Sequence, residues 1–295
     1  AWTAFDAEQI QQSGLCLVSG RQSSLAVKHP RNLRRSGDGA KLLTSNDLDG
    51  FTFRGRFITA TEAASVSYEV SHKAHNALRW LIARQGYHNG DLTVVTWSAD
   101  GKRPPGALET NWITDEDLDF SQEPTVRVSP GSDEMVPESK EKQVYDHSRN
   151  VGKKFAERLD KALRGLRADL KDSRGIAVLA LQAPGPGRLA VTFYREQGVK
   201  TFLERLEAWQ EDFCWILPRK ISPELAKHDP AARYLPHAPT PRQIIFAAYG
   251  PRVDKKLSAL TEQRLLACIV DETPFPRDLV ECCVRRAANP AGCSE

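Results

Sequence analysis

The sequence lacks the features that would place the chain in a membrane or an export pathway. No apolar run approaches the ~20 residues of a membrane-spanning helix, and no basic stretch followed by an apolar one forms a leader. The chain begins with Ala1 rather than Met, so we expect a piece of a longer protein. Because 295 residues can bury a large core, we predict one or two domains. The spacing of the cysteines leads us to predict a cytoplasmic protein.

Cysteine pairs with metal-binding spacing are also absent. The six cysteines stand at positions 16, 214, 268, 282, 283 and 293, and none forms a C-x-x-C pair. This spacing is typical of neither a zinc site nor a disulfide framework. We therefore expect reduced thiols, no metal site and no cofactor.

The chain carries none of the common catalytic motifs. It has no G-x-x-x-x-G-K-[ST], no H-E-x-x-H and no G-x-S-x-G. The run Gly185-Pro186-Gly187-Arg188-Leu189-Ala190 imitates a dinucleotide fingerprint, but a β-rich segment follows it where the fingerprint needs a helix. We interpret this run as a hairpin turn and predict that the protein is not an enzyme.

One pair of histidines and one His-Asp dipeptide leave a metal-dependent nuclease as an alternative. His72 and His75 have a spacing that can chelate a metal on a helix, and His228-Asp229 resembles the dipeptide of metal-dependent phosphohydrolases. Neither pair has further ligands nearby in the sequence. Solvated or hydrogen-bonding histidines explain them as well.

The hydrophobic periodicity predicts an α/β (α+β) fold, with mixed sheets packed on helices and a helical C-terminal third. The predicted strands are 15–19, 24–29, 51–58, 92–99, 176–183 and 188–196. The predicted helices are 61–85, 143–171, 199–217, 241–249, 255–271 and 276–288. Residues 100–140 and 218–240 are rich in proline and are predicted to be loops.

The helix predicted at 61–85 has two distinct faces. An apolar stripe along it contains Val66, Val70, Ala74, Ala77 and Leu81, which we expect to be buried. The opposite side gathers polar and aromatic side chains: Tyr68, His72, His75, Asn76 and Arg79.

Charge is distributed unevenly along the chain, although the net charge is only +3. Ten acids are concentrated in the Pro-rich stretch 109–141, so we predict an α/β domain over 1–112, a linker over 113–140 and an α+β domain over 141–295. The N-terminal domain carries a basic segment. This asymmetry fits either nucleic-acid contact or a solvated linker.

The basic segment leads into an alternating stretch in which Phe51, Phe53 and Phe57 oppose Arg54 and Arg56. Such alternation is typical of a half-buried strand with a solvated face, or of a strand that meets a polyanion. On the second interpretation the nucleic-acid contacts come from this segment, from the loop residue Asn46 and from the polar helix face. The candidate residues are Lys28, Arg31, Arg34, Arg35, Lys41, Asn46, Arg54, Arg56, His72, Asn76 and Arg79.

The order of several longer segments resembles one known family, the large subunit of the type I-C CRISPR surveillance complex (Cascade). The matching segments cover nearly the whole chain. They include CLVSG at 16–20, GDGAKLLTSND at 37–47, GFTFRGRF at 50–57, SYEVSHKAHNALRWLIARQG at 67–86, PGRLAVTFYRE at 186–196, FLERLEAWQEDFCW at 202–215 and AAYGPRVDKKLSALTEQRLLACIVD at 247–271. The chain departs from the family pattern at residues 182–188 and at Gln210, and it is about half as long, so the resemblance implies a central fragment.

The resemblance implies a non-catalytic role in bacterial antiviral defence. It predicts contact with double-stranded target DNA and guide RNA, recognition of the motif beside the target, support of the R-loop, and docking of the helicase-nuclease and other Cascade subunits. The alternative is a structural module that bridges those subunits without touching nucleic acid.

Overall fold

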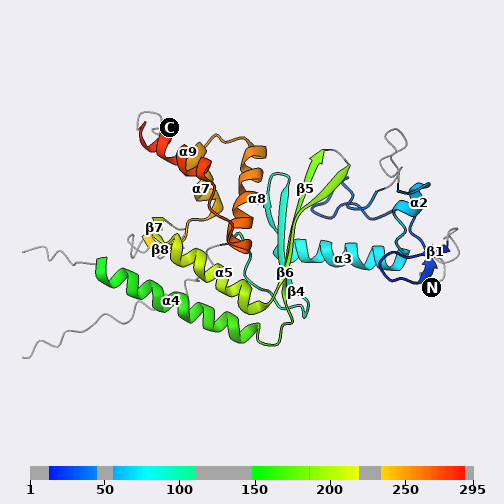
Figure 1. The fold of residues 1–295 in the computed structure, drawn as a ribbon, viewed down its shortest axis with the longest axis horizontal. Helices are drawn as coiled ribbons and strands as arrows, with labels where there is room; N and C mark the ends of the chain where they lie inside the picture. The colour runs from blue at the N-terminus through cyan, green and yellow to red at the C-terminus, as the bar shows by residue number, and fades with distance from the viewer. Residues whose placement is uncertain (1–12, 45–55, 110–147, 186, 219–233, 290–295) are drawn as a thin grey trace, which may run out of the picture.

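The computed structural model describes residues 13–44, 56–109, 148–185, 187–218 and 234–289. Figure 1 labels its helices and strands along the chain. They are β1 (Ser13–Leu15), β2 (Gln22–Ser24), α2 (Ala60–Ala63), α3 (Tyr68–Gln85), β3 (Tyr87–Asn89), β4 (Leu92–Ser98), α4 (Ser148–Asp169), β5 (Ile176–Gly185), β6 (Arg188–Gln197), α5 (Val199–Asp212), β7 (Trp215–Pro218), β8 (Tyr234–His237), α7 (Pro241–Tyr249), α8 (Lys255–Asp271) and α9 (Arg277–Ala287).

A four-stranded antiparallel sheet, in the order β3-β4-β5-β6, forms the centre of the molecule. Strands β4 and β5 pair without interruption from Leu92 opposite Gln182 to Ser98 opposite Ile176. The sheet therefore takes two strands from each side of the stretch 113–140. That stretch lies outside the described residues, and the proposed domain boundaries stay a prediction.

The two faces of this sheet are covered by different parts of the chain. Alternate residues of each strand point to opposite faces, so Val94 and Val178 join one core while Val95 and Leu179 join the other. The first core packs against α4, α5, α7 and α8, and the second packs against α3 and the segment 31–42. Figure 1 shows α3 on one side of the sheet and α5 and α8 on the other.

The helix predicted at 61–85 is two helices, α2 and α3. Ser67 takes extended backbone between them and its side chain accepts the N–H of Val70, which caps α3. The expected apolar stripe is wrong in part. Val66 is buried and Val70 and Leu81 are half-buried, but Ala74 and Ala77 are exposed. The buried residues of α3 are Ser71, His75 and Ile82. Hydrogen bonds to the Ser71 hydroxyl and to Nδ1 of His75 offset part of the cost of burying these two residues, while Nε2 of His75 has no partner among the described residues.

The strands predicted at 15–19 and 24–29 are wrong in position, because β1 and β2 end at Leu15 and Ser24 and most of the predicted residues lie in turns and irregular chain. Strand β8 also falls within the loop predicted at 218–240. The elements from β4 to α9 otherwise follow the sequence more closely. Strands β5 and β6 form the hairpin expected from the Gly-Pro run, with Gly187 at a φ of 82°, which favours glycine. Helices α7, α8 and α9 confirm the helical C-terminal part. Helix α5 ends at Asp212, before the predicted end at 217, because the chain turns there into the ribbon β7–β8.

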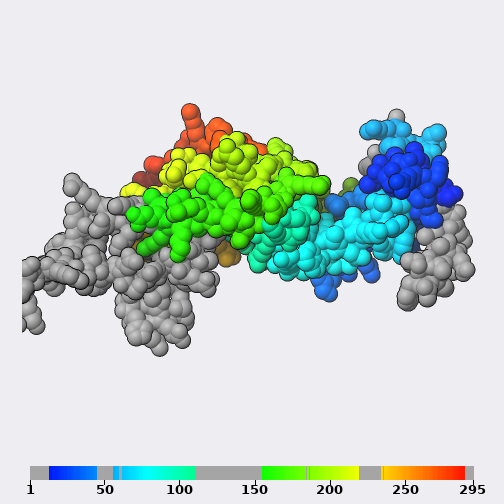
Figure 2. All heavy atoms as spheres, turned by 90° about the horizontal axis from the view of Figure 1, so that it is seen from below, coloured from blue at the N-terminus to red at the C-terminus, as the bar shows by residue number. Residues whose placement is uncertain are grey.

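The structure confirms an α+β fold with mixed layers. Its outline is elongated, with the N-terminal elements at one end and the C-terminal helices towards the other (Figure 2). Within the described ranges, no helix combines the length and the apolar character that crossing a membrane requires.

Candidate nucleic-acid interface

The basic segment 25–44 is an irregular chain fixed at both ends. Near its start, the N–H of Ala26 donates to the carbonyl of Val66, and near its end Lys41 pairs with Arg188 and exchanges backbone hydrogen bonds with Gly187 and Leu189. Between these points Leu33 and Ala40 are buried in the sheet's second core. The cations of the segment are therefore displayed on an anchored backbone rather than on a free loop.

Within this segment, Arg34 is occupied by contacts with other residues of the protein. Its guanidinium forms a fork with the carboxylate of Asp38, with Nε 2.8 Å from Oδ2, and it also donates to the carbonyl of Asp91. Both side chains of the ion pair are less than a tenth exposed. The pairing holds the pKa of Asp38 below its ordinary value, mainly through the hydrogen bond from Arg34. Arg34 is thus committed to the protein, whereas its neighbour Arg35 is exposed.

A buried chain of polar groups attaches His29 to α3. The Nδ1 atom of His29 lies 2.8 Å from Oγ of Ser71, and Nδ1 of His75 donates to the Ser71 carbonyl at 2.6 Å. The two imidazole rings stack with 6.1 Å between their centroids. Burial lowers the pKa of both histidines. His75 therefore belongs to the interior and not to the polar face on which the sequence placed it.

The exposed side of α3 carries the other predicted helix residues. Arg79 donates to the carbonyls of Arg31 and Asn32 and to the side chain of Asn76. His72 stacks on Tyr68 with 4.1 Å between ring centroids. This face also exposes Trp80, an aromatic side chain that the sequence pattern did not indicate.

The cations that remain available run along the outside of the segment. Within the described ranges, the side chains of Lys28, Arg31, Arg35 and Lys41 have no hydrogen-bond or ion-pair partner. The guanidinium of Arg56 lies 5.7 Å from the ring centroid of Phe57. Asn46 and Arg54 lie outside the described residues, as do Phe51 and Phe53.

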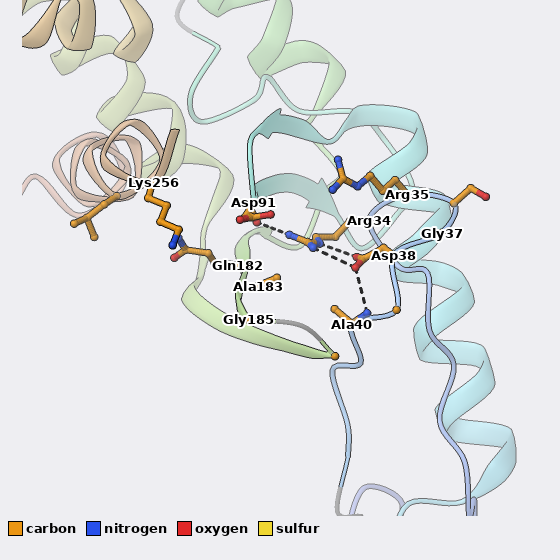
Figure 3. A pocket seen from close by; sticks show the side chains of 14 residues that line it. Arg34, Arg35, Gly37, Asp38, Ala40, Asp91, Gln182, Ala183, Gly185 and Lys256 are labelled. Carbon is orange, nitrogen blue, oxygen red and sulfur yellow. Dashed lines mark hydrogen bonds and ion pairs between the residues drawn. The ribbon is translucent and has the colours of Figure 1, made fainter. Parts of the chain in front are cut away.

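The segment ends beside a hollow of about 830 Å³ that is lined by four glycines together with charged and polar side chains (Figure 3). One wall is the turn 35–40, and the opposite wall comes from the β5–β6 hairpin, with Gln182, Ala183, Gly185 and Gly187. Asp91, Lys256 and Leu260 complete the lining. Arg34 and Asp38, which form an ion pair, are part of the first wall. The glycine clusters were visible in the sequence, but their apposition was not.

A model of one protein family matches this chain. The model is described as CRISPR-associated protein (Cas_Csd1), and the match covers residues 1–295. The chain belongs to the Cas_Csd1 family. It is therefore a CRISPR-associated protein of the Cascade type, as the resemblance implied. No curated protein matches it.

The Cas_Csd1 chain has a positive environment around the hollow. His88, which lines a neighbouring pocket with Arg34 and Arg35, has a pKa lowered first by burial and then by those two guanidinium groups. Lys256, in the first turn of α8, adds a further cation from a distant part of the chain. Sequence reasoning missed Lys256 because 215 residues or more separate it from the segment 25–41.

The two histidines of α3 in this Cas_Csd1 chain have different surroundings and do not face a common site. His75 faces Ser71 in the interior, while His72 stacks outside on Tyr68. Among the described residues, no three His, Cys, Asp or Glu side chains gather as a metal site would need. His228 and Asp229 lie outside the described residues.

Proposed function

We propose that this Cas_Csd1 chain is a non-catalytic nucleic-acid-binding part of a type I-C CRISPR interference complex. The observation that carries the proposal is a row of cations that have no partner among the described residues, on a backbone anchored near α3 and to the β5–β6 hairpin. These cations are Lys28, Arg31, Arg35 and Lys41. Side chains of this kind bind phosphates, which position a nucleic acid without reading its sequence. In such a complex, guide pairing reads the sequence.

The proposal includes the finer roles that the family suggests. Target DNA and guide RNA are the expected polyanions, and helicase-nuclease docking, R-loop support and recognition of the motif beside the target are the expected tasks. His72, Asn76 and Arg79 lie on the exposed side of α3 next to Arg31, so they extend the same surface. Asn46, Arg54 and Arg56 remain candidates that adjoin it in sequence.

The test is the triple variant Lys28→Ala, Arg31→Ala, Arg35→Ala, measured for DNA binding across a salt series. Each lost phosphate contact should reduce the slope of log affinity against log salt by about 0.9, so we expect a change of roughly 2 to 3. Affinity at low salt should fall by roughly tenfold to a hundredfold.

The matched control removes three exposed cations elsewhere, with Lys171→Ala, Arg174→Ala and Lys200→Ala. It changes the net charge by the same amount, so it separates a local surface from a general effect of charge. The same slope change in both variants would contradict the proposal.

A structural bridging role is the second candidate, and exposed apolar side chains favour it. Leu17, Val18 and Val27 are each more than half exposed near the N-terminal end of the described chain. Apolar surface of this kind is typical of protein interfaces. Binding to other complex subunits, combined with no affinity for DNA or RNA at low salt, would favour this role over the first.

A further inference from the structure

The hollow between the turn 35–40 and the β5–β6 tip has the size of a ligand site. Its volume of about 830 Å³ lies within the range of small-molecule pockets. Its walls come from segments that are about 145 residues apart, and these segments are joined by the backbone pairing of Lys41 with Arg188. The hollow is therefore a product of tertiary structure and not a gap inside one loop.

Each wall of the hollow contains two glycines, where the backbone is bare. At Gly37, Gly39, Gly185 and Gly187, an added Cβ would meet nothing within 4 Å. Gly37 and Gly187 need glycine for their positive φ, whereas Gly39 and Gly185 have no such backbone reason. Glycine without backbone strain often marks a place where a ligand approaches the chain closely. A flat group can lie against such a wall.

The hollow is lined by cations and by hydrogen-bonding side chains. Arg35 and Lys256 supply positive charge at its rim, and neither side chain has a partner among the described residues. Gln182 and Asp91 supply an amide and a carboxylate, and Figure 3 shows Lys256 extending towards Gln182. The charge of Asp38 is already neutralised by Arg34.

We infer that this hollow binds one nucleotide turned out of its strand, with the phosphate on Arg35 and Lys256 and the base between the two walls. An amide and a carboxylate suit the edge of a base that carries an amino group, since carboxylates accept from cytosine and glutamine pairs with adenine. Thymine and uracil fit less well. This inference rests on the proposed function. It adds that one nucleotide of the bound strand is turned out and held in the hollow.

The probe is a set of single-stranded DNA oligonucleotides that each carry 2-aminopurine at one position, titrated with the full 295-residue chain. Emission from 2-aminopurine rises when the base leaves the stack. Anisotropy of an end label on the same oligonucleotides reports binding itself. We expect emission to rise at one position or a few while anisotropy reports saturation.

The variant Gly185→Leu fills the hollow without disturbing the backbone, and Gly39→Leu does so from the other wall. Either should abolish the emission change and weaken binding by about tenfold, the equivalent of one good base contact. Gly165→Leu is the control, since Gly165 lies on the exposed side of α4 and an added Cβ meets nothing there either. It should leave both signals as in the unmodified chain.

The outcomes separate this inference from the proposed function. Binding by anisotropy with no emission change at any position would overturn the inference and leave the proposed function standing. The same would follow if Gly185→Leu and Gly39→Leu both kept the emission change.

A second arm titrates the chain with free dAMP and dTMP, which tests whether the source of the nucleotide is a strand or a free molecule. Binding of dAMP alone, lost in Gly185→Leu, would support the hollow and overturn the strand as its source. No binding of either oligonucleotide or mononucleotide would overturn both the inference and the proposed function.

Discussion

At the scale of single residues, the most informative group outside the site is the carboxyl of Glu262. This side chain of α8 is fully buried, and its Oε1 accepts a hydrogen bond from Tyr87 at 2.7 Å. Its Oε2 has no partner among the described residues. Burial raises the pKa of Glu262 above its ordinary value of 4.5. The carboxylate loses its hydrogen bonds to water on folding, and the protein replaces only some of them.

Glu262→Gln should therefore stabilise the protein at pH 8. A carboxyl whose pKa is raised on folding contributes stability fully below its unfolded pKa, and this contribution is lost as the pH rises through the folded value. Glutamine keeps an oxygen for Tyr87 and has no charge to bury. We expect the variant to gain about 1 kcal/mol over the unmodified protein at pH 8 and little or nothing at pH 4.5.

Urea unfolding at a series of pH values measures this difference. Tyr87→Phe is the matched variant, because it removes the hydroxyl that donates to Oε1 and should destabilise the protein by about 1–3 kcal/mol at neutral pH. A constant difference between Glu262→Gln and the unmodified protein from pH 4.5 to 8 would show that Glu262 has the same protonation in both states.

At the scale of elements, α3 shows where reasoning from sequence stopped. The spacing of apolar residues located a helix, and its end at Gln85 agrees with the prediction. The buried face was misidentified because Ser71 and His75, two polar residues, occupy it. Ser71 is hydrogen-bonded there by His29, more than 40 residues earlier, and the Nδ1 atom of His75 donates to the carbonyl of Ser71. A partner so distant leaves no periodic signal in the helix itself.

The candidate site was predictable to a similar extent. The basic residues of 28–41 were apparent from composition, and the hairpin was apparent from its Gly-Pro turn. The sequence could not show which of these cations are available for binding. Arg34 and Arg35 are neighbours with the same side chain, yet Arg34 is paired with Asp38 and Arg35 is exposed. The hollow was also not predictable, because Lys256 and Asp91 reach it only through the packing of α8 and the turn between β3 and β4.

The contact between segment 25–33 and α3 should weaken below about pH 6.5. His29 and His75 have lowered pKa values in the folded protein, so the unfolded chain binds protons first as the pH falls, and stability is lost from the ordinary histidine value downward. The ionisable groups around them, His72, Lys41 and Arg79, are all cations or potential cations and offer no compensation. Each histidine can remove up to about 1.4 kcal/mol per pH unit.

Amide hydrogen exchange compared at pH 7.5 and 5.5, corrected for the intrinsic effect of pH, measures this locally. Protection of residues 25–33 should fall at pH 5.5, while amides in the middle of α8, far from any of these histidines in sequence, serve as the internal reference. His75→Leu removes one of the two titrating groups and should reduce the loss. Equal protection of the segment at both pH values would contradict the role of the pair.

At the scale of the whole molecule, the central sheet makes the two parts of the chain depend on each other. Each part contributes one hairpin-like pair, β3–β4 before residue 110 and β5–β6 after residue 147. A two-stranded hairpin is marginal by itself, and three or more strands with a covered face are needed for stability. The first core confirms this dependence, since Leu92 and Val94 of β4 pack with α5 and α8.

Two fragments, 1–128 and 129–295, should therefore fold together and not apart. Expressed alone, each would expose one edge of the broken β4–β5 pairing and its apolar residues, so we expect aggregation or a non-cooperative thermal transition. Expressed together, they should purify as one complex, because seven residue pairs and two cores rejoin. Val94→Asp in the first fragment is the control and should prevent assembly, since it places a charge in the core. If fragment 1–128 alone unfolded cooperatively, the N-terminal part would be an independent domain, and the sheet would be a docking surface between two domains rather than the common core that its strand order indicates.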